Sequence, residues 1–176
     1  MNPENSSIVE QYRSYREEYN PLRIRKKIKI LFIAESPPPK PTKKELPYFY
    51  NKDSRFKGLC QHFNNAIYDG KIDGKRKFLQ RFRDDGYFLI DLFSTRHELD
   101  QVRKKVNYEN VTKISQRLFK RIEKLKPEKV VLIGKRSIKL ITGCLPFGNK
   151  TNKERFKKFI RSSIILEFSR VHGESS

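Results

Sequence analysis

The sequence is short of cysteine, of acidic residues and of long apolar runs, and each shortage excludes a class of protein. Only two of its 176 residues are cysteines, Cys60 and Cys144, and they form no paired-cysteine motif. Two cysteines cannot supply a four-cysteine cluster, and they do not indicate a disulfide framework. We therefore expect two buried thiols in a reducing, cytoplasmic compartment. The three histidines are scattered, without the spacing of metal ligands, so no metal and no cofactor are predicted.

The apolar runs are far shorter than the ~20 residues that a membrane-spanning helix needs. The first residues are polar and do not resemble a signal peptide. We expect no membrane partner, and no feature of the sequence indicates an oligomeric state.

The sequence contains half as many acidic residues as basic residues. The chain has 40 Lys and Arg against 20 Asp and Glu, a formal net charge of +20. Positive charges in such excess repel one another unless a polyanion neutralises them. A lysine-rich thermophile surface is the alternative, but that composition raises glutamate in step with lysine. The imbalance therefore predicts binding to DNA, single- or double-stranded, through release of counterions from phosphates.

Short apolar runs alternate with amphipathic helical patterns along the chain. Continuous apolar runs predict strands buried on both faces at residues 30–34, 87–93 and 130–134, and a short fourth strand at 143–147. Helical spacing predicts helices over about residues 8–19, 56–67, 78–82, 111–125, 135–141 and 156–160. The alternation predicts an α/β protein with a mainly parallel sheet covered by helices on both faces.

The chain divides into three parts by this pattern. Residues 1–27 form an amphipathic helix with a basic lead-in, residues 28–169 a single α/β domain, and residues 170–176 a frayed tail.

In parallel sheets, ligands bind beyond the carboxyl ends of the strands. Glu35, Ser36 and Pro37 follow the first predicted strand, and Asp91 lies near the end of the second. We expect Ser36 and Pro37 to contact DNA. A carboxylate in an apolar stretch must be desolvated, so it needs a partner or a function. For Asp91 the alternative is a helix cap or an ion pair with Arg96. For Glu35 the alternative is an exposed turn.

Two further segments allow two interpretations each. The segment Gly134, Lys135, Arg136 and Ser137 resembles the end of a phosphate-binding loop, but the earlier glycine of that motif is absent. It forms either a cationic helix start for a phosphate or a plain turn. The aromatic residues 48–50 either stack on a base or anchor their loop in the core.

The order of these segments resembles the uracil-DNA glycosylase superfamily, particularly its small bacterial and archaeal branches. The segments that carry the resemblance are ILFIAESPPP (30–39), YFYN (48–51), FLIDLF (88–93), VVLIGK (130–135) and LPFGNKTNKERF (145–156). The Asp-Pro-Tyr and His-Pro-Ser elements of the best-known branch are missing, as are the cysteines of the iron–sulfur branch.

This resemblance implies a three-layer α/β/α fold with a central four-stranded, mainly parallel sheet. It implies that Glu35 activates water, that Asp91 reads the base, and that Phe49 or Tyr50, beside Asn51, stacks on the extruded base. Gly148, Asn149 and Lys150 would enter the minor groove.

Three functions follow as hypotheses. The first is a monofunctional, metal-independent DNA glycosylase that removes a deaminated or damaged base, with Glu35 as the leading catalytic candidate and Asp91 second. The second is a nucleic-acid-binding protein that keeps the fold but not the reaction. The third is a nuclease that holds a metal with Asp91, Glu128 and Lys129.

Overall fold

The computed structural model describes residues 3–38, 48–96, 98–100, 108–133 and 164–166. Its helices and strands alternate along the chain, as the sequence pattern predicts. In chain order they are α1 (Pro3–Glu18), the short 3-10 helix η1 (Pro21–Ile24), β1 (Ile30–Ala34), α2 (Leu59–Tyr68), α3 (Lys75–Asp84), β2 (Tyr87–Asp91), α5 (Tyr108–Leu125), β3 (Lys129–Ile133) and β4 (Ile164–Leu166).

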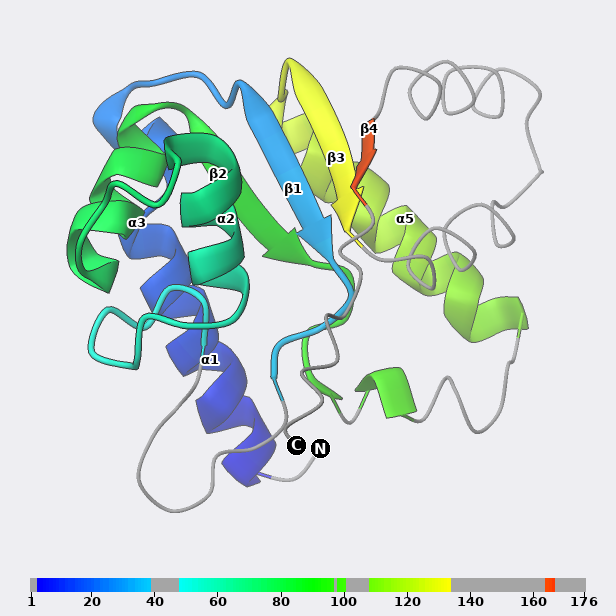
Figure 1. Ribbon diagram of the computed structural model, residues 1–176. Coiled ribbons are helices and arrows are strands. Elements are labelled where there is room, and N and C mark those ends of the chain that lie inside the picture. Colours follow the sequence, from blue (N-terminus) through cyan, green and yellow to red (C-terminus); the bar gives the residue numbers. More distant parts are fainter. Residues whose placement is uncertain (1–2, 39–47, 97, 101–107, 134–163, 167–176) are drawn as a thin grey trace, which may run out of the picture.

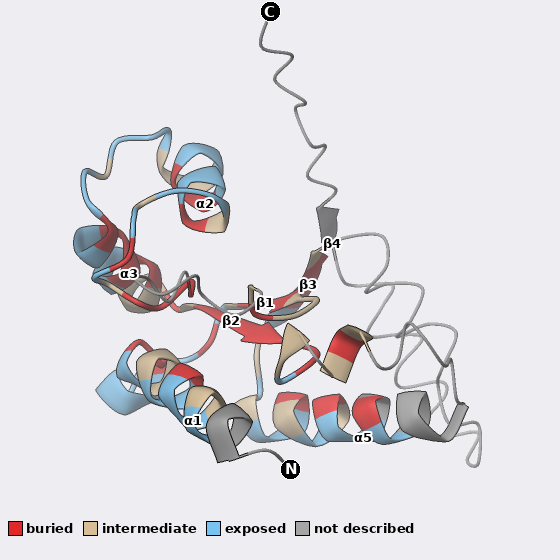
Figure 2. Ribbon diagram, turned by 90° about the horizontal axis from the view of Figure 1, so that it is seen from below, coloured by how far each residue is buried: buried red, intermediate tan, exposed pale blue. Residues whose placement is uncertain are grey.

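The strands form one parallel sheet in the order β2-β1-β3-β4. The chain passes from β1 to β2 through α2 and α3, and from β2 to β3 through α5 (Figure 1). Figure 2 shows α2 and α3 on one face of the sheet and α1 and α5 on the other. Because β2 and β3 lie on opposite sides of β1, the order of the strands reverses there, and such a reversal opens a crevice at the carboxyl edge.

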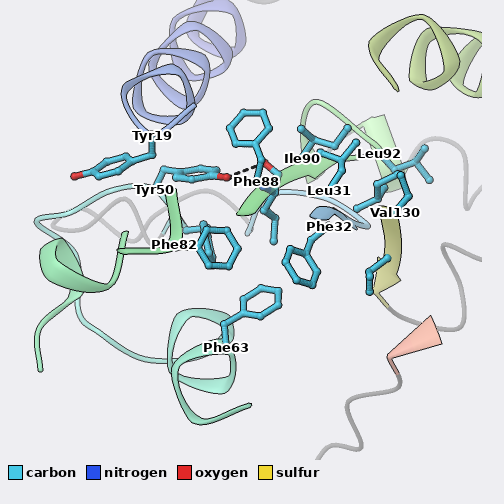
Figure 3. Packing of buried hydrophobic residues seen from close by; sticks show 14 of the residues in the cluster. Tyr19, Leu31, Phe32, Tyr50, Phe63, Phe82, Phe88, Ile90, Leu92 and Val130 are labelled. Carbon is cyan, nitrogen blue, oxygen red and sulfur yellow. Dashed lines mark hydrogen bonds between the residues drawn. The ribbon is translucent and has the colours of Figure 1, made fainter. Parts of the chain in front are cut away.

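An aromatic core fills the space between the sheet and α2 and α3. The ring of Phe32 on β1 lies 4.6 Å from Phe63 of α2 and 5.7 Å from Phe82 of α3, measured between ring centroids. Figure 3 shows these three rings grouped beside the strands. On the other face, α5 contributes the buried side chains of Ile114 and Leu118. Burial on both faces explains why the strands are continuous apolar runs.

The outer edge of β2 is closed by a side chain. The hydroxyl of Tyr50 accepts a hydrogen bond from the backbone N–H of Leu89 at 2.7 Å and donates one to the carbonyl of the same residue at 3.1 Å. One phenol thus satisfies two backbone groups that a further strand would otherwise pair. The ring of Tyr50 stacks 6.0 Å from Tyr19, next to the end of α1 (Figure 3).

The predicted α/β class with a parallel sheet is confirmed, and the first three predicted strands lie within about one or two residues of β1, β2 and β3. The strand predicted at 143–147 and the helices predicted at 135–141 and 156–160 lie outside the described residues. β4 instead lies at Ile164–Leu166, where the sequence pattern did not predict a strand.

The amino-terminal helix shares the core of the sheet. Tyr12 and Tyr19 are buried, and both belong to the same hydrophobic cluster as the strands. Tyr12 and Tyr19 of the amino-terminal segment therefore contribute to the same core as the sheet. Within the described ranges, no helix combines the length and apolar character needed to cross a membrane.

Candidate functional site

The two predicted carboxylates stand at neighbouring strand ends. Asp91, the last residue of β2, is the register partner of Ala34 at the end of β1. The pairing continues one step beyond the strands, where the N–H of Phe93 donates to the carbonyl of Glu35 at 3.0 Å. The carboxyl edge at which parallel sheets bind ligands thus carries both acids.

A recess of about 350 Å³ opens beside Asp91. We call it the aromatic hollow. It is lined by Ala34, Ser36, Pro37, Pro38, Tyr48, Phe49, Ser54, Arg55, Lys57, Gly58, Leu59, Cys60, Lys75, Leu89 and Asp91. Its size is at the lower end of the range for small-molecule pockets, which suits one flat ring system.

Two polar side chains in the wall of the aromatic hollow, those of Lys75 and Cys60, are bound by neighbouring protein atoms. The buried ammonium group of Lys75 donates to the carbonyl of Tyr48 at 2.8 Å and to the hydroxyl of Ser54 at 2.6 Å. Cys60 donates its thiol to the carbonyl of Phe49 at 3.4 Å, and burial raises the pKa of this thiol to about 12. Lys75 and Cys60 therefore hold the 48–54 segment in place, and neither is poised as a nucleophile.

Asp91 and Tyr48, in the same wall, differ from Lys75 and Cys60 in this respect. The side chain of Asp91 is 5% exposed, and neither its Oδ2 atom nor the hydroxyl of Tyr48 has a hydrogen-bond partner in the described part of the chain. Burial raises the pKa of Asp91 to about 6, although Arg16, Arg121 and the nearby phenol of Tyr48 favour its charged form. A buried carboxyl with one unsatisfied oxygen and a pKa close to neutrality is typical of a group that receives a ligand or a proton.

A second recess, of about 200 Å³, lies on the α1 and α5 side of Asp91. We call it the arginine hollow. Its lining residues are Val9, Tyr12, Arg13, Arg16, Pro37, Tyr48, Asp91, Phe93, Ser94, Arg117 and Arg121. The two hollows share Pro37, Tyr48 and Asp91, which form the wall between them.

Glu35 is placed differently from Asp91. Ala34, Ser36 and Pro37 line the aromatic hollow, but the side chain of Glu35 lines neither recess. Glu35 lies in a bend directly after the end of β1.

Two of the three predicted base-binding residues are structural. Tyr50 is fully buried with its hydroxyl bound to β2, so its ring faces offer no surface to a base. Asn51 is also buried, and its side-chain oxygen accepts from the N–H of Asp53 to shape a turn. For these residues the structure favours core anchoring over stacking. Phe49 alone of the three lines the aromatic hollow.

The arrangement predicted for a nuclease is wrong. Glu128 and Lys129 lie at the amino end of β3, where Lys129 is level with Ile30, whereas Asp91 is level with Ala34. Four residues of a parallel strand separate these levels, about 13 Å, which is too far for one metal ion. Among the described residues, no group of three His, Cys, Asp or Glu side chains is placed to hold a metal ion.

The remaining predicted DNA contacts, Lys135–Ser137 and Gly148–Lys150, lie outside the described residues. The structure adds site residues that the sequence did not single out, above all Arg16, Arg121 and Lys75. Nothing in the sequence distinguishes these three among 40 cationic residues, since only the fold brings them beside Asp91.

Comparison with known proteins adds no assignment. No family model matches the chain, and neither a curated protein nor a solved structure is similar to it.

Proposed function

We propose that this protein is a DNA glycosylase that hydrolyses the N-glycosidic bond of a flipped, uracil-type or otherwise damaged base, with Asp91 as its central polar group. The observation that carries the proposal is the unsatisfied, buried carboxyl oxygen of Asp91 beside a recess of single-base size. Phe49, Pro37 and Pro38 supply apolar surface for the faces of a base. The parallel strand order and the surplus of cations are consistent with the resemblance to uracil-DNA glycosylases.

The chemistry follows from the position of Asp91. Cleavage of the glycosidic bond develops positive charge on the sugar and negative charge on the leaving base. An ionised Asp91 would stabilise the sugar and orient or deprotonate the attacking water. The phenol of Tyr48, whose pKa burial raises, stays protonated and can donate to the base. Glu35, which the sequence ranks first, becomes the second candidate because it borders neither hollow.

A screen for base release tests the proposal. Labelled single- and double-stranded oligonucleotides carrying uracil, hypoxanthine, xanthine or an oxidised base are incubated with the protein, and abasic sites are revealed with alkali. We expect release of at least one base without strand cleavage before alkali. Asp91→Asn should lose about 100-fold or more in rate, and the matched variant Glu35→Gln only a few-fold. Equal losses in both variants would refute the assignment to Asp91.

The pH dependence provides an independent check. The base function needs the ionised carboxylate, and the pKa of Asp91 lies at about 6. Release should therefore rise with pH through about 6 and level off above it. A rate that falls over this interval would instead assign the neutral acid to the reaction.

One observation favours a second candidate, a nucleic-acid-binding protein without catalysis. Glu35, the residue that the resemblance assigns to water activation, lines neither hollow. This candidate predicts salt-dependent DNA binding with no base released from any lesion. Turnover on any of them would exclude it.

A further inference from the structure

The positively charged side chains that line the arginine hollow outnumber the negatively charged side chains available to neutralise them. Four arginines, Arg13 and Arg16 from α1 and Arg117 and Arg121 from α5, line it together with a single acid, Asp91. Two of the four have carboxylate partners elsewhere: Arg117 pairs with Glu98 at 2.6 Å, and Arg13 with Glu10 at 3.7 Å.

Arg16 and Arg121 are the remaining two, and they lack such partners. Arg121 donates one hydrogen bond, from Nη1 to the backbone carbonyl of Asp91 at 2.9 Å. No hydrogen bond from the Arg16 side chain is found in the described part of the chain, and the charges of both arginines favour the ionised form of the Asp91 carboxyl group. Burial, together with the positive charge of Arg16, lowers the pKa of Arg121 to about 10. Arg16 and Arg121 thus share this recess with a single carboxylate, that of Asp91, so among the described residues one of their two positive charges has no anion in the recess.

The chemistry of the missing group follows from the donors. A guanidinium presents a planar fork of N–H groups that binds phosphate oxygens in pairs. A recess of about 200 Å³ with such donors on two helices accommodates one compact, tetrahedral anion.

A row of mainly cationic side chains on α5, which we call the cationic track, extends to the arginine hollow. Lys113, Gln116, Arg117, Lys120, Arg121 and Lys124 line a neighbouring recess of about 420 Å³. These residues recur on one face of the helix and extend over about 17 Å of its axis. Arg117 and Arg121 belong to both recesses. A repeating polyanion fits this continuity better than an isolated small anion.

We propose that the arginine hollow binds a backbone phosphate of a nucleic-acid strand, whose neighbouring phosphates follow the track on α5. The phosphate site stands without any catalysis. One further element rests on the proposed function: a base next to this phosphate would lie in the aromatic hollow, on the other side of the wall formed by Asp91 and Tyr48.

The test measures binding to a labelled, undamaged 12-nucleotide single strand by fluorescence anisotropy across a range of salt concentrations. Arg16→Gln should weaken binding about tenfold and reduce the slope of log affinity against log salt by about 0.7, the effect of one lost phosphate contact. Arg16→Lys, which keeps the charge but not the fork, should keep the slope and lose affinity. Arg23→Gln is the matched control, because Arg23 is exposed on η1, before the amino end of β1.

Equal behaviour of Arg16→Gln and Arg23→Gln would overturn the proposal. If thermal melting shows that Arg16→Gln is unfolded, Arg13→Gln takes its place, since the side chain of Arg13 is 65% exposed. Inorganic phosphate should displace the strand better than chloride of the same ionic strength. Phosphate binding that depends on Arg16 while strand binding does not would assign the hollow to free phosphate and refute the nucleic-acid part. Because the strand contains no damaged base, these results are independent of base release.

Discussion

The two hollows on either side of Asp91 differ in how the protein satisfies their polar groups. In the aromatic hollow, Lys75 and Cys60 donate to carbonyl and hydroxyl oxygens of the same chain. In the arginine hollow, Arg16 has no acceptor among the described residues and Arg121 has one. Donors that are bound within the protein, like those of Lys75 and Cys60, hold the shape of a recess, whereas guanidinium groups with few acceptors can bind an anion. This difference supports the proposed base in the first hollow and the proposed phosphate in the second.

The largest effect on stability is expected from Asp91→Asn, because Asp91 lies in the wall that both hollows share. The pKa of Asp91 is about 6 in the folded protein against an ordinary value of 3.8, so the folded state holds this proton more tightly than the unfolded state. Stability from this group is present below about pH 4 and is lost as pH rises to about 6. A pKa difference of this size corresponds to about 3 kcal/mol.

Asp91→Asn should therefore be more stable than the wild type at pH 8, by up to about 3 kcal/mol, and the advantage should shrink towards pH 4. Urea unfolding at several pH values measures this, with the exposed residue substitution Asp73→Asn as control. Lower stability of Asp91→Asn at pH 8 would mean that the carboxylate has a stabilising ionic partner, and the wall would not be an unsatisfied site.

A smaller effect is expected from Tyr50→Phe, behind the aromatic hollow. Loss of the hydroxyl leaves the backbone N–H and carbonyl of Leu89 without this partner, at a cost of about 2 kcal/mol. The control is Tyr15→Phe, whose hydroxyl accepts only an exposed hydrogen bond from Gln11. Chemical denaturation of both variants gives the difference. Similar free energies of unfolding would show that Tyr50 is not what closes the edge of β2.

The smallest expected effect connects the two hollows. The positive charge of Arg16 favours the ionised form of Asp91, so Arg16→Gln should move the pKa of Asp91 further above 6, by less than about one pH unit. Titration of the Asp91 carboxyl carbon by NMR measures the midpoint, with Arg23→Gln as the unchanged control. A midpoint that stays or falls would show that the two hollows are electrostatically separate.

The sequence predicted the strands better than it ranked the side chains at their ends. Ile30–Ala34 is a continuous apolar run, and such a run has one natural structure in an alternating α/β chain. Glu35 and Asp91 both occur at strand ends, and the sequence has no means of telling which points into a recess. The fold decides this, because Asp91 is still part of β2 whereas Glu35 lies in the bend after β1.

The aromatic segment 48–50 shows the same division. Its composition allowed either stacking on a base or anchoring in the core. The structure uses Tyr50 as a cover for the edge of β2 and Phe49 as a wall of the aromatic hollow. Two adjacent aromatic residues thus have separate roles, and that of Tyr50 is set by its contact with Leu89, 39 positions away.

The sequence by itself determined the α/β class and the surplus of positive charge, because both follow from local apolar periodicity and from composition. Only the tertiary structure decided that Arg16 of α1 and Arg121 of α5 share one recess with Asp91 of β2. Those residues are separated by dozens of positions, and the packing of two helices against one strand end brings their charges together.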